Sequence, residues 1–183
     1  MRWDALFDDL EAQLAAADQR GLDAEVADRT RGETAGLTLE DRLRGQVGRL
    51  LRLRVAGIGA LSGSLTHVGA GWLTLRTGTR TELVALRHVL ALEGLDRFSR
   101  TEEARVRPGF ASVLRTLAAD RAAVQIVTVD PDASFRVTGV IDRVGHDFLE
   151  IAAGPAGETR TRTNITGVLT LPLPAVAVVG SLT

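Results

Sequence analysis

The 183-residue chain contains no cysteine, no tyrosine and no lysine. The absence of cysteine excludes disulfide bonds, thiolate metal sites and a cysteine nucleophile, and it fits a reducing compartment. Aromatic residues make up only 4% of the chain, which argues against a surface that binds single-stranded nucleic acid by stacking bases on rings. The formal net charge is −1, so a nucleic-acid-binding surface would have to be a local basic patch rather than a property of the whole chain.

Long apolar runs are also missing. No stretch reaches the ~18 apolar residues that a membrane-spanning helix needs. Acidic residues interrupt the N-terminal sequence MRWDALFDDLEAQL, where a secretory signal would be apolar. We therefore expect a soluble, cytoplasmic protein without membrane contact. Hydrophobic residues make up 45% of the chain, which is enough for the core of one mid-sized domain or of two small ones.

An amphipathic pattern marks the N-terminal region, residues 1–37. Five large apolar residues recur there at helical spacing: Trp3, Leu6, Phe7, Leu10 and Leu14. The spacing places them on one face of a helix over residues 4–20. This face could dock a partner protein or drive self-association, or it could pack against the remainder of the same chain.

One pattern occurs twice in the chain. LSGSLTHVGAGWLTL at residues 61–75 matches VTGVIDRVGHDFLEI at residues 137–151 without a gap. A short helical pattern precedes each copy, and apolar residues at period two predict strands within and around it. The sequence therefore predicts two copies of a unit with one helix and five strands. The predicted divisions are the N-terminal helical region (1–37), the first copy (38–95), a linker (96–108) and the second copy (109–183).

The repeated pattern G-x-[LI]-x-x-V-G-x-x-[WF]-L-x-[LI], from Gly63 and again from Gly139, resembles the first motif of the Sm-like family. This family (Hfq/LSm-type) includes the bacterial RNA chaperone Hfq. The resemblance implies a mainly β protein with some α: two tandem Sm-like small five-stranded antiparallel barrels, each preceded by a short helix, plus the N-terminal helical region. It also implies a role in RNA metabolism or gene regulation through binding of RNA or DNA. The whole chain further resembles a protein family of high-GC Gram-positive bacteria.

The chain departs from the Sm-like pattern at the positions that hold bases. The loop after the second strand carries Gly69, Ala70 and Gly71 in the first copy, where family members use Asp and often Asn or an aromatic residue. The Arg-Gly pair of the family's second motif is missing from both copies. Nucleic-acid binding is therefore implied by membership of the fold more than by site residues.

A basic segment supplies the candidate nucleic-acid contacts. RLRGQVGRLLRLR, residues 42–54, resembles the arginine-bearing rim by which Hfq contacts RNA, and an Arg-His pair lies near the position of a Lys-His pair in Hfq. The candidate residues are Arg42, Arg44, Arg49, Arg52, Arg54, Arg87 and His88. The alternative is an ordinary solvated surface whose charge is partly countered by Glu40 and Asp41.

No catalytic motif accompanies these patterns. GIGALSG, residues 57–63, has the wrong spacing for a dinucleotide fingerprint, and the histidines lack metal-binding spacing. We therefore expect a protein that is not an enzyme and has no cofactor or metal.

The second functional hypothesis is a protein-interaction or oligomerisation scaffold without nucleic-acid binding. It would act through the N-terminal helix or the edge strands of the barrels, because an open sheet edge readily pairs with another chain. Pro172 and Pro174 would remove backbone donors near one edge and limit growth there.

Overall fold

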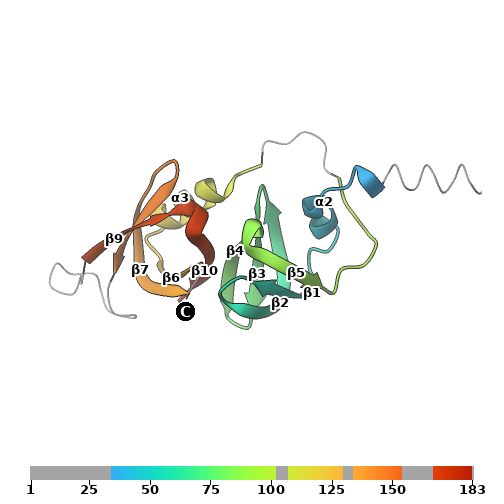
Figure 1. Cartoon of the computed structure of the whole chain (residues 1–183), viewed down its shortest axis with the longest axis horizontal. Coiled ribbons are helices and arrows are strands. Elements are labelled where there is room, and N and C mark those ends of the chain that lie inside the picture. Colours follow the sequence, from blue (N-terminus) through green and yellow to red (C-terminus); the bar gives the residue numbers. More distant parts are fainter. Residues whose placement is uncertain (1–33, 102–106, 130–133, 154–166, 183) are drawn as a thin grey trace, which may run out of the picture. The chain divides into compact units, whose positions relative to one another are not determined.

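The computed structural model describes residues 34–101, 107–129, 134–153 and 167–182 (Figure 1). The chain divides into two units, Met1–Thr38 and Leu39–Thr183, and the second unit holds every strand of the described residues. The predicted helix over residues 4–20, with Trp3, Leu6, Phe7, Leu10 and Leu14, lies outside the described residues.

The described residues of the second unit form two α-helices, two single-turn 3-10 helices and ten strands. In the first half these are α2 (Leu39–Arg44), β1 (Leu50–Val55), β2 (Gly59–Gly69), β3 (Trp72–Thr77), β4 (Arg80–Ala85), η1 (Leu86–His88) and β5 (Val89–Glu93). In the second half they are α3 (Phe110–Ala119), β6 (Ala123–Thr128), β7 (Phe135–Val144), β8 (Phe148–Ala153), β9 (Gly167–Pro172), η2 (Leu173–Ala175) and β10 (Val176–Ser181). The mainly β character predicted from the alternation is confirmed.

The prediction of two closed five-stranded barrels of the Sm-like type is wrong. All ten strands form one antiparallel sheet in the order β5-β1-β2-β3-β4-β10-β6-β7-β8-β9, and this sheet is not closed. The two halves join because β4, which pairs with β3 on one side, pairs on its other side with β10, the last strand of the other half. This pairing satisfies the backbone groups at the edge of β4 in a way that the local pattern of either copy does not reveal.

Each half nevertheless repeats one strand order: β5-β1-β2-β3-β4 is matched by β10-β6-β7-β8-β9. The second strand of each half also carries an irregularity at the same place, between Leu65 and His67 and between Ile141 and Arg143. The repeated glycine lies where strands approach closely, because a Cβ atom on Gly139 would come within 2.2 Å of the Ala152 carbonyl oxygen. No other residue fits this position without a shift of the backbone.

The core follows from the alternating pattern. In β1 the apolar residues of one face are buried and the arginines of the other face are exposed. Val68 is only half-buried, whereas five other apolar residues of the first half are buried: Leu53, Val55, Leu65, Leu73 and Leu75.

The two halves share their cores across the β4–β10 pairing. The cluster centred on the first half includes Val127, Ala177 and Val178 of the second. The cluster centred on the second half includes Trp72, Leu83 and Ala85 of the first. The halves are therefore packed together by apolar contacts as well as by the backbone pairing.

The two helices differ in how much of the sheet they cover. α3 has ten residues and buries Phe110 and Leu114, whereas α2 has six residues. Neither helix in the described part of the chain has the length and apolar composition that crossing a lipid bilayer requires.

Candidate functional site

Among the strands that the structure describes, the two at the ends of the sheet, β5 and β9, have a neighbour on one side only. In the repeat, β5 corresponds to β10 and β9 corresponds to β4, because η1 lies between β4 and β5 and η2 lies between β9 and β10. The pairing of β4 with β10 thus shows, inside one chain, how the fourth strand of one half joins the fifth strand of the other half. We refer to it as the internal junction.

The internal junction is short and well packed. It pairs Val84 with Val178, Leu83 with Val179 and Glu82 with Gly180. Ala177 is 0% exposed beside it. At one end the backbone N–H of Thr81 donates a hydrogen bond of 2.9 Å to the Ser181 hydroxyl.

Glu82 and Gly180 form an unusual pair in this junction. A Cβ atom on position 180 would lie 2.6 Å from Oε2 of Glu82, so the glycine leaves room for the carboxylate. Burial raises the pKa of Glu82, and the nearby positive charge of Arg80 opposes this shift. The charged form of Glu82 is therefore disfavoured at the junction.

Arg87 and His88, both predicted to contact nucleic acid, bridge the two halves at the 3-10 turns. The Arg87 guanidinium donates hydrogen bonds to the carbonyl oxygens of Pro174 and Val176, each at 3.2 Å, and to that of Leu173. Nε2 of His88 lies 2.7 Å from the Pro174 carbonyl oxygen. Both side chains therefore connect η1 of the first half to η2 and the start of β10 in the second half, next to the internal junction.

Arg87 also stacks on the start of α3. Its guanidinium carbon lies 5.3 Å from the centre of the Phe110 ring, a distance at which a cation and an aromatic ring attract each other. Burial lowers the pKa of Arg87, although an arginine keeps its proton at all physiological pH values.

Apolar side chains are exposed along the two free edges. On β5, Leu90 is 66% exposed. On β9, Val168 is 57% and Leu169 38% exposed. Unpaired backbone groups together with exposed apolar side chains are the properties of a strand that can accept another strand.

Besides Arg87, three more of the predicted arginines are engaged within the chain. Arg44 is buried and paired with Asp41 at 2.5 Å and with Glu40 at 2.9 Å. Arg42 donates a hydrogen bond of 2.8 Å to the Asp96 carbonyl oxygen, and Arg49 forms an ion pair with the Asp96 carboxylate.

Asp96 organises the segment after β5. The side chain of Gln46 donates a hydrogen bond to its carboxylate, and this bond, followed by one from the Phe98 backbone, lowers the pKa of Asp96. The carboxylate therefore remains charged beside Arg49.

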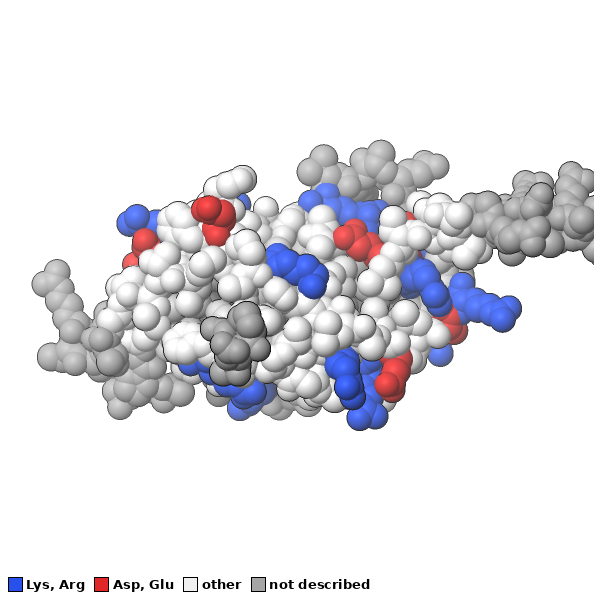
Figure 2. Space-filling model, in the orientation of Figure 1, with Lys and Arg blue, Asp and Glu red and all other residues white. Residues whose placement is uncertain are grey.

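Arg52 and Arg54 lie on the exposed face of β1, in register with Glu93 and Ala91 of β5. The structure thus brings Arg42 and Arg49 together at Asp96, and brings Arg87 and His88 together at the internal junction, but these two groups share no contact. Figure 2 shows basic groups scattered among uncharged and acidic ones on the face that it presents.

No group of three or more His, Asp or Glu side chains in the described part of the chain is arranged to hold a metal ion. Comparisons of the chain with protein-family models, with curated proteins and with solved structures found no match. Sequence reasoning did not single out Leu90, Val168 and Leu169, because only the strand order shows that they lie on free edges.

Proposed function

We propose that the protein is a non-enzymatic oligomerisation scaffold whose copies associate head to tail, with β9 of one copy pairing with β5 of the next. The observation that carries this proposal is the internal junction, in which the counterparts of β9 and β5 already pair. In a second copy of the chain, β5 is available to pair with β9 of the first copy, as β10 pairs with β4 inside the molecule.

The internal register defines the pairing between copies. Transferred to the free strands, it pairs Leu171 with Ala91, Thr170 with Leu92 and Leu169 with Glu93. Leu90 then occupies the position of Ala177, which is fully buried in the internal junction. Removal of exposed apolar surface from water at these positions favours association.

The prolines near β9 do not block this pairing. Pro172 corresponds to Ala85 in β4, and Ala85 lies outside the three residue pairs of the internal junction. Pro174 belongs to η2, not to the strand. A missing N–H donor at these two positions therefore removes no hydrogen bond that the internal junction uses.

Nucleic-acid binding has less support from the geometry. Arg42, Arg44, Arg49, Arg87 and His88 all contact other groups of the chain. The arginines of β1 remain exposed, but two side chains supply few of the phosphate contacts on which such binding depends.

A head-to-tail interface closes into a ring if its rotation closes, and otherwise continues as a filament. Sedimentation velocity or light scattering after gel filtration would measure the mass of the wild type over a series of concentrations. We expect masses above that of one chain. Leu90→Arg and Leu169→Asp should each shift the mass towards one chain, because the first buries an unpaired charge and the second places a carboxylate opposite Glu93.

The matched control is Leu50→Arg. Leu50 is 71% exposed but belongs to β1, which has neighbours on both sides. This variant should keep the wild-type mass. A wild type that remains one chain at every concentration, or edge variants that assemble as well as the control, would contradict the proposal.

A further inference from the structure

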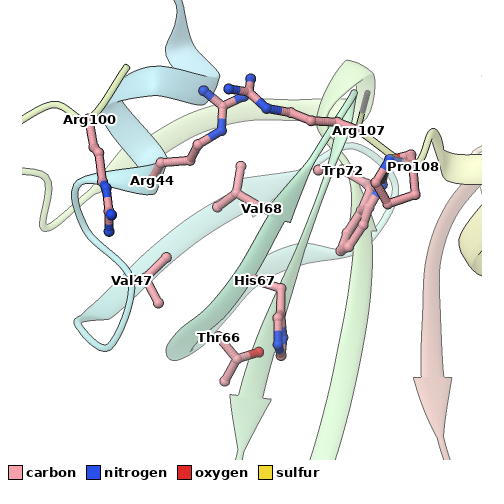
Figure 3. A pocket seen from close by; sticks show the side chains of 10 residues that line it. Arg44, Val47, Thr66, His67, Val68, Trp72, Arg100, Arg107 and Pro108 are labelled. Carbon is pink, nitrogen blue, oxygen red and sulfur yellow. Dashed lines mark hydrogen bonds between the residues drawn. The ribbon is translucent and has the colours of Figure 1, made fainter. Parts of the chain in front are cut away.

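A pocket of about 430 Å³ lies beside α2 (Figure 3). Its volume is within the range of ~300–1,000 Å³ typical of small-molecule sites. Residues from α2, from the turn after it, from the β2–β3 hairpin and from the segment before α3 line the pocket, among them Arg44, Val47, Val68, Trp72, Arg100 and Pro108. This site is separate from the sheet edges and does not depend on the oligomerisation proposed above.

The pocket follows from the short length of α2. In the second half, α3 continues for ten residues and packs Val113, Leu117 and Ala118 against the core. In the first half, α2 ends at Arg44, the chain turns with Gly48 at φ +93°, and Val47 remains 51% exposed. The face of β2 that a longer helix would cover is therefore left open.

The walls of the pocket are held in place by specific bonds. The Glu40 carboxylate accepts a hydrogen bond of 2.8 Å from the Gly71 backbone, which fixes α2 to the β2–β3 turn. Nε1 of Trp72 donates a bond of 2.8 Å to the Pro108 carbonyl oxygen. Because the polar atom of Trp72 is engaged, its ring contributes only apolar surface to the pocket.

Three arginines line the pocket: Arg44, Arg100 and Arg107. The terminal nitrogens of Arg44 bind Asp41 and Glu40, but its Nε is buried and has no hydrogen-bond partner among the described residues. The guanidinium of Arg100 forms no hydrogen bond or ion pair with the described part of the chain. A buried N–H donor such as Nε of Arg44 normally has a hydrogen-bond acceptor, so an acceptor oxygen in the pocket would supply the missing bond.

The remaining lining is largely apolar. Figure 3 shows Arg44, Val47 and Arg100 on one side of the pocket, Trp72 and Pro108 on the other, and Val68 between them. A ligand that fits both parts carries a negative charge at one end and an apolar body at the other. Three arginines against the two carboxylates of Glu40 and Asp41 leave this end with a net positive charge, which disfavours a cation there.

We propose that this pocket binds a small organic acid, whose carboxylate meets Nε of Arg44 and the guanidinium of Arg100 and whose apolar body packs against Val47, Val68 and Trp72. A carboxylate matches the donor geometry of a guanidinium group. The pocket size limits the body to a short aliphatic chain or a single ring.

Fluorescence of Trp72 provides a direct test. The chain has two tryptophans, so Trp3→Phe leaves Trp72 as the only one. In this background, titration with octanoate should change the emission in a saturable manner. Octanamide, which has the same apolar body but no charge, should bind about tenfold more weakly or worse, because charge-assisted bonds are the stronger ones.

Three variants test whether octanoate binds in this pocket. Arg100→Ala should weaken octanoate binding about tenfold, and Val68→Trp, followed by calorimetry since it adds a tryptophan, should abolish binding by filling the pocket. Arg136→Ala is the control, because Arg136 is exposed on β7 in the other half, and it should bind octanoate as the parent does. Circular dichroism would confirm that each variant is folded.

A peptide that ends in leucine with a free carboxylate is titrated in parallel. Octanoate binding that is saturable, charge-dependent and tighter than peptide binding supports the proposal. The absence of a saturable change with octanoate, equal affinity for octanamide, no effect of Arg100→Ala, or tighter binding of the peptide would overturn it, the last by assigning the pocket to a protein C-terminus.

Discussion

β10 and β5 occupy the same place in the two halves of the sheet, but β10 has neighbours on both sides and β5 on one. Ala177 of β10 is 0% exposed, whereas its counterpart Leu90 is 66% exposed. Likewise, Gly180 is buried and its counterpart Glu93 is exposed. The same strand position is thus interior or surface depending only on whether a fourth strand lies beside it.

β4 and β9 show the same contrast from the other side. Val84 of β4 is fully buried, and its counterpart Leu171 is 7% exposed, so both keep one side chain in the core. Leu83 is buried at 3% by the internal junction, whereas its counterpart Thr170 is exposed. The internal junction therefore covers the side chain of Leu83 on β4, whereas the equivalent position on β9, Thr170, remains open to solvent.

The largest expected effect compares the two equivalent positions on the fifth strands. Ala177→Asp should lower the free energy of unfolding by about 3 kcal/mol or more, because it buries an unpaired charge. Leu90→Asp should change the stability of a single chain by no more than about 0.5 kcal/mol. Urea unfolding at low protein concentration measures both, and equal losses would remove the distinction between the two strands.

The repeated glycine of the second strand should give the next largest effect. Gly139→Ala places a Cβ atom 2.2 Å from the Ala152 carbonyl oxygen, so we expect a loss of about 1–3 kcal/mol from the overpacked strand. Gly167→Ala is the control, since a Cβ there meets nothing within 4 Å. Thermal unfolding followed by circular dichroism compares them, and a Gly139→Ala protein as stable as the control would show that the strands can separate at little cost.

Arg87→Ala tests the bridge between the 3-10 turns. It removes hydrogen bonds to the carbonyl oxygens of Leu173, Pro174 and Val176, for which we expect a loss of about 1–2 kcal/mol. Arg54→Ala, on the exposed face of β1, should change stability by less than about 0.5 kcal/mol. If chemical denaturation finds both variants equally stable, Arg87 does not hold the halves together.

The smallest effect concerns pH and Glu82. Burial raises the pKa of Glu82 above its usual value of 4.5, so the folded protein binds this proton more tightly than the unfolded chain. The resulting stability is complete below pH 4.5 and is lost as the pH rises through the raised pKa.

Glu82→Gln should remove this pH dependence. Because the group is only half-buried, we expect the variant to gain less than about 1 kcal/mol relative to wild type at neutral pH. Unfolding free energies of both proteins across the acid range measure the difference. A difference that is constant with pH would show that Glu82 titrates normally in the folded protein.

Local patterns predicted the elements well. Apolar alternation from Leu51 to Val55 indicates the buried face of β1. Arg87 and His88 interrupt the run of strand-forming residues from Glu82 to Leu95, and η1 lies there. Such features depend on residues close together in the chain, where side-chain period reports directly on backbone geometry.

The joining of the halves could not be predicted in the same way. β4 and β10 are far apart in sequence, and nothing local to either strand specifies its partner. The resemblance of each copy to the Sm-like motif led to the incorrect prediction of two closed barrels. The buried Arg44 resembles the accessible Arg42 in sequence, and only the acids three and four residues before it indicate its pairing.

The most direct test of head-to-tail pairing uses the absence of cysteine from the chain. Glu93→Cys and Leu169→Cys together place thiols at the positions that correspond to Gly180 and Glu82, which face each other in the internal junction. On mild oxidation the double variant should form disulfide-linked species of two or more chains on a non-reducing gel. The combination of Leu50→Cys with Leu169→Cys should not. If the two double variants cross-link to the same extent, or neither cross-links, β9 does not pair with β5 in this register and the proposed assembly is contradicted.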